Sequence, residues 1–181
     1  GVEAADLPRV VAVLDAYSKG NLTNIIALTG LRRQLERPAP ASILPPGLPA
    51  ARVQGLPLDP LPAIGDLTPA LAARVRALAA RHEGAGDGVI PSLYLALAQW
   101  PGLIEAVPDW LAGLYEPATL RAARAAICVA AEAEAAVLLP DIGQPPASAA
   151  DILPVLRRFT GLVIPDLIPV CLALRRLAPP G

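Results

Sequence analysis

Apolar residues recur at helical spacing along most of this sequence, whereas the alternation that marks a β-strand is scarce. Ala, Leu and Arg, which favour helices, fill most of the periodic segments. The pattern therefore predicts an all-α fold. We expect helices at 5–18, 21–36, 69–82, 90–99, 101–115, 117–138, 148–160 and 163–178.

Three of the expected helix starts carry capping signals. Thr68 precedes a proline, which suits the first turn of a helix, and Ser148 with Asp151 three residues later resembles a capping box. Asn21 stands ahead of an apolar run and belongs to the best N-cap residue types. An amide buried without partners is costly, so a cap, a protein partner and a ligand are the alternatives for Asn21 and for Asn24 behind it.

The helical pattern stops between Arg37 and Pro69. Residues 38–69 hold nine of the 22 prolines and few charges, so this stretch suits neither a helix nor a solvated flexible tail. We predict an extended linker whose apolar residues lie against the helices. These residues are Ile43, Leu44, Leu48, Val53, Leu56 and Leu61.

A weak internal repeat frames this linker. A shift of 143 residues lays 21–35 over 164–178 and matches two Leu-Arg-Arg triplets. The part after the linker then has front helices (69–138) and closing helices (148–178), whereas the part before it has closing helices only. Within one domain, we therefore expect closing helices of a first repeat at 1–37, a linker at 38–69 and a complete second repeat at 70–181.

Composition and charge exclude several classes of function. The net charge of −1 offers no basic field for nucleic acid, and aromatic residues, at 3%, are too few for a stacking platform. No uninterrupted apolar run approaches the roughly 18 residues of a membrane-spanning helix. We therefore expect neither a nucleic-acid partner nor a membrane partner.

Metal and nucleophile chemistry has few candidate residues. His82 is the only histidine, and Cys128 and Cys171 lack the spacing of metal ligands. We therefore expect no metal, no cofactor, and no Ser-His-Asp or Cys-His centre. The first residues show no secretory signal, so we expect a cytoplasmic protein with reduced thiols.

Three segments carry the most distinctive sequence of the chain. They read LDAYSKGNLTNIIALTGLRRQLE at 14–36, GVIPSLYLALAQWPGLIEAVPDWLAGL at 88–114 and RRFTGLVIPDLIPVCLALRRLAPP at 157–180. A Pro-Ser turn stands before a helix that closes in Trp-Pro-Gly, and Ile-Pro opens the last helix. In these segments the chain resembles the group I 2-haloacid dehalogenases, all-α enzymes built from two pseudo-symmetric repeats. Members of that family extend further at the N-terminus, so the resemblance implies that the front half of repeat one is lacking here.

The resemblance implies a pocket for a short 2-halocarboxylic acid. In that family an aspartate deprotonates a water that attacks C2 directly and expels halide with inversion, without a covalent ester and on both enantiomers. The family's pocket asparagine falls on Asn21, and an aromatic pocket position falls on Asn24. A pocket role for Asn21 is compatible with an N-cap role, because the free N–H groups of a helix start also attract anions.

The catalytic aspartate of the family has no counterpart in this sequence. Its motif falls on Pro91, Ser92 and Leu93, and the isobutyl group of Leu93 cannot accept a proton. Asp166, isolated among apolar neighbours, is a candidate substitute base. The alternative is an early-turn aspartate that the positive helix end favours.

The resemblance also implies an apolar pocket wall. The alternative is that its residues are ordinary residues of the apolar core. That wall falls on Thr160, Val163, Ile164 and Leu167.

Three classes of function therefore remain open. The first is a dehalogenase-type hydrolase acting on a small halogenated or related carboxylic acid, impaired or altered by Leu93. The second is a catalytically silent relative that binds such an acid, and the third is a helical interaction or assembly module. Because helices 5–18 and 21–36 would lack the front half that covers them, we expect a homodimer.

Overall fold

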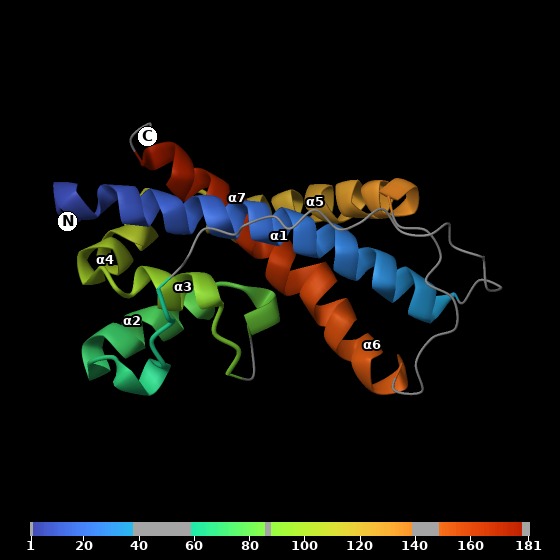
Figure 1. Ribbon diagram of the computed structural model, residues 1–181, viewed down its shortest axis with the longest axis horizontal. Coiled ribbons are helices and arrows are strands. Elements are labelled where there is room, and N and C mark those ends of the chain that lie inside the picture. The colour runs from blue at the N-terminus through green and yellow to red at the C-terminus, as the bar shows by residue number, and fades with distance from the viewer. Residues whose placement is uncertain (1, 38–58, 86–87, 139–148, 179–181) are drawn as a thin grey trace.

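The computed structural model describes residues 2–37, 59–85, 88–138 and 149–178, and no strand occurs among them (Figure 1). The expected all-α fold is confirmed. The helices are α1 (Leu7–Glu36), α2 (Pro69–Ala79), α3 (Ser92–Leu97), α4 (Pro101–Trp110), α5 (Pro117–Leu138), α6 (Ala149–Arg158) and α7 (Ile164–Leu177), with short 3-10 turns η1 (Ala4–Asp6), η2 (Ile64–Asp66) and η3 (Glu83–Ala85).

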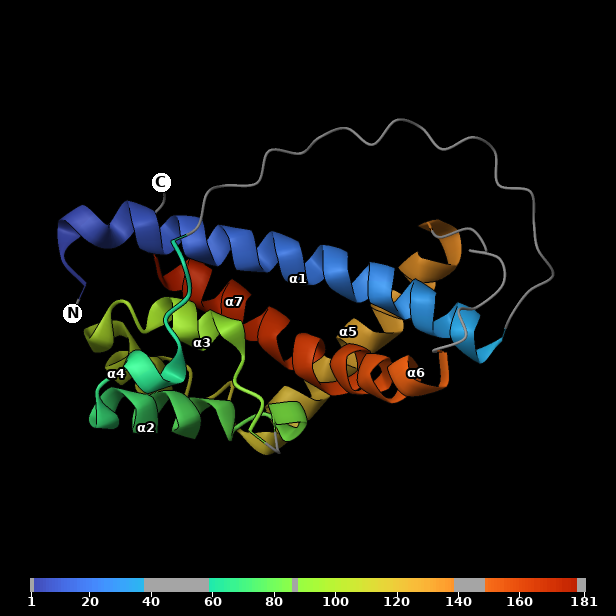
Figure 2. The ribbon, with the colours of Figure 1, turned by 60° about the horizontal axis from the view of Figure 1, so that its bottom comes forward.

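The N-terminal region forms one helix, α1, of 30 residues, so the expected break between residues 18 and 21 is wrong. Gly20 stands at the expected break, but a glycine inside a helix costs only about 1 kcal/mol relative to alanine. Burial outweighs that cost, because α1 runs along α7 and also contacts α5 and α6 (Figure 2). Asn21 is therefore an interior helical residue and not an N-cap. The residues that α1 buries are Val10, Val13, Leu14, Ile25, Thr29 and Gly30.

The same packing covers α1 within the chain, so an uncovered helix face no longer supports a homodimer. The expectation that 5–18 and 21–36 lack cover within the chain is wrong, because α7, α5, α6 and α3 all contact α1. The homodimer itself stays a prediction, as does the internal repeat. None of the described helices combines the length and the apolar character that crossing a membrane requires.

Residues 149–177 form one helical stretch, where two separate helices were expected. A π-turn at residues 159–163 interrupts it between α6 and α7. Pro165 explains the interruption, because it has no N–H to donate to the carbonyl of Gly161 four residues earlier. The Cys128 thiol on α5 donates weakly to the carbonyls of Thr160 and Gly161, at 3.6 and 3.9 Å. The Cys128 thiol is therefore a weak hydrogen-bond donor to two carbonyls of the π-turn.

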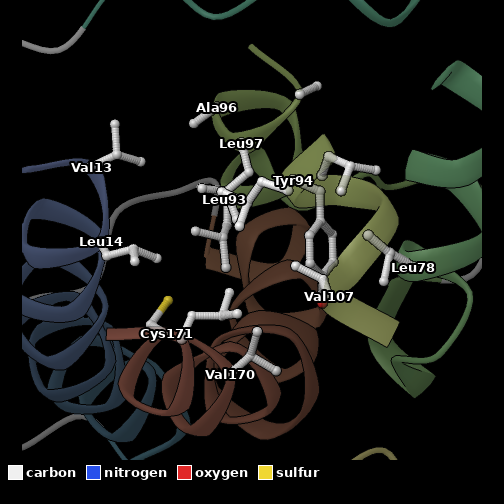
Figure 3. Packing of buried hydrophobic residues seen from close by; sticks show 14 of the residues in the cluster. Val13, Leu14, Leu78, Leu93, Tyr94, Ala96, Leu97, Val107, Val170 and Cys171 are labelled. Carbon is white, nitrogen blue, oxygen red and sulfur yellow. The ribbon is translucent and has the colours of Figure 1, made fainter. Parts of the chain in front are cut away.

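The apolar core consists of two clusters, and α7 contributes to both. The main cluster joins α1, α2, α3, α4 and α7, and Leu93, Leu97, Val107 and Val170 have no exposed surface in it (Figure 3). α7 therefore stands between the two packing regions of the molecule. The second cluster, from α1, α5 and α7, consists of Ile25, Ala131, Ile164 and Ile168.

One of the other expected caps is confirmed. The Thr68 hydroxyl accepts a hydrogen bond from the Leu71 N–H at 3.4 Å, and Pro69 is the first residue of α2. Ser148 and residues 38–58 of the expected linker lie outside the described residues. Leu61, in the described part of the linker, is exposed, so the expectation that it lies against the helices is wrong.

Gly84 in η3 lies against the π-turn and has no room for a side chain. A Cβ at Gly84 would lie 2.7 Å from Val163 Cγ2, 2.8 Å from Leu162 Cβ and 2.9 Å from the Val163 backbone nitrogen. Arg158 Nε donates to the Gly84 carbonyl at 2.9 Å. This close approach places the turn that follows α2 beside the π-turn that precedes α7.

We expect Gly84→Ala to lower the free energy of unfolding by about 1–3 kcal/mol, the usual cost of overpacking, because two of the close contacts are to backbone-fixed atoms. Gly161→Ala is the matched control on the facing π-turn, because a Cβ added there meets no atom within 4 Å. Urea unfolding of both variants measures the difference. Equal midpoints for the two variants would contradict this packing.

Candidate functional site

Polar side chains of α1 and α3 meet at a small surface hollow of about 190 Å³. Five residues of α1 line it. Four of them, at positions 17, 20, 21 and 24, have the i, i+3, i+4, i+7 spacing that puts them on one stripe of the helix. The first residue of α3 faces them. The complete lining is Ala16, Tyr17, Gly20, Asn21, Asn24 and Ser92.

A side-chain hydrogen bond joins the hollow to α7, and Tyr17 and Ser92 interact across it. Asn21 Nδ2 donates to the Cys171 sulfur on α7 at 3.6 Å. Burial raises the pKa of the Cys171 thiol to about 12, so that sulfur stays a neutral acceptor at physiological pH. Burial also raises the pKa of Tyr17, and a hydrogen bond with Ser92 partly offsets this rise. The polar groups of the hollow are therefore uncharged at neutral pH.

Leu93, which occupies the position of the family's base, faces the core rather than the hollow. Successive side chains on a helix are about 100° apart, so Ser92 and Leu93 point in different directions. Pro91 is the N-cap of α3 and is buried. Leu93 has no exposed surface and packs in the main cluster with Cys171 (Figure 3). The structure thus brings Asn21, Asn24 and Ser92 together and separates Leu93 from them.

The expected apolar wall does not line this hollow. Val163 and Leu167 belong to the main core cluster, and Ile164 belongs to the second cluster. Thr160 donates to the Leu156 carbonyl at 2.8 Å and borders a different hollow, of about 180 Å³, near Cys128. Three of these four residues therefore belong to the apolar core, and none of the four lines the hollow.

Asp166 is bound in an ion pair inside the molecule. It has no exposed surface, and its two carboxylate oxygens lie 2.8 Å from Arg124 Nε and 3.4 Å from Arg124 Nη2. Arg124 Nη1 lies 2.5 Å from Glu83 Oε2, and this contact lowers the pKa of Glu83. The carboxylate of Asp166 is therefore engaged by a cation and has no contact with solvent.

His82 extends this buried polar network towards α3. Its Nδ1 lies 3.6 Å from Asp166 Oδ2, too far for a good hydrogen bond, and its Nε2 lies 2.5 Å from the Tyr94 hydroxyl. The Tyr94 hydroxyl lies 3.0 Å from that of Tyr115. Nε2 is therefore bonded within the protein, whereas Nδ1 faces Asp166 without forming a hydrogen bond.

Other hollows among the described residues offer weaker chemistry. One of about 620 Å³ beside α2 has His82 in its wall, and Nε2 of this histidine is already bonded to the Tyr94 hydroxyl. A hollow of about 390 Å³ between α1 and α5 contains Arg32 and Arg33, which are both paired with Glu132. A third, of about 240 Å³, has an almost wholly apolar lining. The part of the chain that the structure describes contains no group of three metal-ligating side chains.

The sequence pattern missed Tyr17, Gly20 and His82. Tyr17 and Gly20 share a stripe with Asn21, and that spacing could have revealed them if α1 had been taken as one helix. His82 gave no comparable signal, because its neighbours Tyr94 and Asp166 come from two separate helices.

Comparison with known proteins adds no family assignment. No protein-family model matches the chain, and a search of the curated proteins finds no match. The resemblance to haloacid dehalogenases therefore stays a prediction. The hollow between α1 and α3 is the feature that bears on function.

The three tyrosines yield a pH prediction, because burial raises the pKa of each. The pKa of Tyr115 rises to about 12, and that of Tyr94 lies well above its ordinary value of 10.0. The unfolded chain therefore releases protons above pH 10 that the folded chain retains, so this stability is complete below pH 10 and is lost as the pH rises towards 12.

We expect the ultraviolet absorbance of tyrosinate at pH 10 to be well below half of its final value in the folded protein. In guanidinium at the same pH, about half of the tyrosines should be ionised. The Tyr115→Phe variant should remove one titrating group above pH 10 without changing the folded absorbance below it. Half-ionised tyrosine in the folded protein at pH 10 would contradict the buried network.

Proposed function

We propose that the hollow between α1 and α3 binds a short-chain carboxylic acid, and that the protein is a dehalogenase-like binder without hydrolytic activity of the family type. The observation that carries the proposal is the convergence of four uncharged hydrogen-bonding side chains on one hollow. Both asparagines of the sequence are among them. The resemblance to haloacid dehalogenases supports the same ligand class.

The chemistry of the walls suits a carboxylate. A side-chain amide has two N–H donors, and Asn21 uses its Nδ2 for one bond to Cys171, which leaves a donor for the ligand. The hydroxyl groups of Tyr17 and Ser92 are bonded to each other, which leaves one of their two O–H donors for the ligand. Hydrogen bonds to a charged group contribute about 1.5–3 kcal/mol each. The hollow has the volume of roughly six water molecules at about 30 Å³ each, which suits an acid of a few carbons.

The same walls provide no base. Hydrolysis of the family type needs a proton acceptor within hydrogen-bond reach of the attacking water, and the lining of the hollow contains neither a carboxylate nor an imidazole. Leu93 is buried in the core, and Asp166 is bound by Arg124. Loss of a positioned base typically costs roughly 10²–10⁴ in rate. Binding without turnover is therefore the proposed behaviour.

Titration of the ¹⁵N-labelled protein with 2-chloropropionate tests the proposal through the side-chain amide signals of its two asparagines. We expect both pairs of signals to shift and to saturate, with a dissociation constant on the order of 1 mM, about −4.1 kcal/mol. Asn21→Ala should weaken binding about tenfold, the equivalent of one hydrogen bond of roughly 1.4 kcal/mol. No halide should be released above background.

Thr23→Ala is the matched control on α1. Thr23 is exposed, does not line the hollow, and donates to the Lys19 carbonyl at 3.0 Å. Its replacement should leave the dissociation constant unchanged. Unaltered binding by Asn21→Ala would contradict the proposed site. Halide release by the unmodified protein would contradict the absence of a base, and Asp166→Asn would then identify or exclude Asp166.

A further inference from the structure

Gly20 stands in the interior of α1 without a structural reason for being glycine. Glycine is the least favourable residue inside a helix apart from proline. Its φ is not positive, so the backbone conformation does not require it. A Cβ added there would meet no atom within 4 Å, so packing does not require it either, in contrast to Gly84. The missing side chain leaves open space on the wall of the hollow.

We propose that Gly20 sets the size of the acid that the hollow accepts, an inference that rests on the proposed binding function. Gly20 lies three residues after Tyr17 and four before Asn24, on the stripe of α1 that lines the hollow. A side chain at this position projects between those two residues. It would therefore occupy the space in which a ligand lies.

The geometry divides the hollow into a polar part and an open part. The amide of Asn21 and one hydroxyl of the Tyr17–Ser92 pair bind the carboxylate, and the carbon chain of the acid with its C2 substituent lies over Gly20. The three carbons of a valine side chain occupy about 90 Å³, at about 30 Å³ per heavy atom. Valine at position 20 would therefore fill about half of the hollow of about 190 Å³. The ligand class is accordingly a 2-substituted short-chain acid rather than the smallest acids alone.

Two acids of different size, chloroacetate and 2-chlorobutyrate, test this role by their dissociation constants. The unmodified protein should bind both. Gly20→Val should weaken the binding of 2-chlorobutyrate by about tenfold or more. It should change the dissociation constant of chloroacetate by less than about threefold, because overpacking affects only the larger ligand. The dissociation constant of Gly20→Ala for 2-chlorobutyrate should lie between those of the unmodified protein and Gly20→Val. Its thermal midpoint of unfolding should be higher than that of the unmodified protein, because alanine is the better helix residue.

Ala27→Val is the matched control, since Ala27 is an exposed residue of α1 that does not line the hollow. It should change neither dissociation constant. An unchanged ratio of the two constants in Gly20→Val would overturn the size role and leave the binding function standing. Equal loss of both acids in Gly20→Ala, with a verified fold, would overturn the size role as well. Failure of the unmodified protein to bind either acid would overturn the binding function and this inference together.

Discussion

The ion pair between Asp166 and Arg124 is the interaction on which the arrangement of the helices depends. Asp166 has no exposed surface, and a buried carboxylate without a charged partner costs several kcal/mol. Arg124 contacts both Asp166 and Glu83, so α7, α5 and the turn after α2 meet at one point. His82 extends the contact to Tyr94 on α3. Any shift of α7 along its axis would leave the charge unpaired, so the pair fixes the register of the central helix.

Helical periodicity predicted the all-α class, because apolar residues at helical spacing must be buried together. It could not predict the continuity of the helices. The signal at Asn21 is local and favours a helix start, whereas burial of Leu14 and Ile25 against α7 acts along the whole of α1 and prevails. Pro165 likewise marks a boundary in the sequence. The structure continues through it with a π-turn, which the Cys128 thiol on α5 supports.

The polar residues of the site were predictable only where a single stretch of sequence carried them. Asn21 and Ser92 belong to segments with distinctive motifs, and the structure places them in one hollow. Gly20 escaped notice because a supposed break separated it from its own helix. The contacts of His82 and Asp166 join elements far apart in the chain, and no spacing rule encodes such a pairing. The hollow is therefore more polar, and the core around α7 more charged, than the sequence pattern indicates.

We infer that the buried carboxylate of Asp166 holds the helices together rather than activating water. The most direct test is the free energy of unfolding of Asp166→Ala, measured by urea denaturation beside Asp109→Ala, which removes an exposed aspartate on α4. We expect a loss of about 3–5 kcal/mol for Asp166→Ala, because Arg124 is left without its buried partner. The control should change stability by no more than about 0.5 kcal/mol. A loss for Asp166→Ala as small as that of the control would contradict this role of the buried carboxylate.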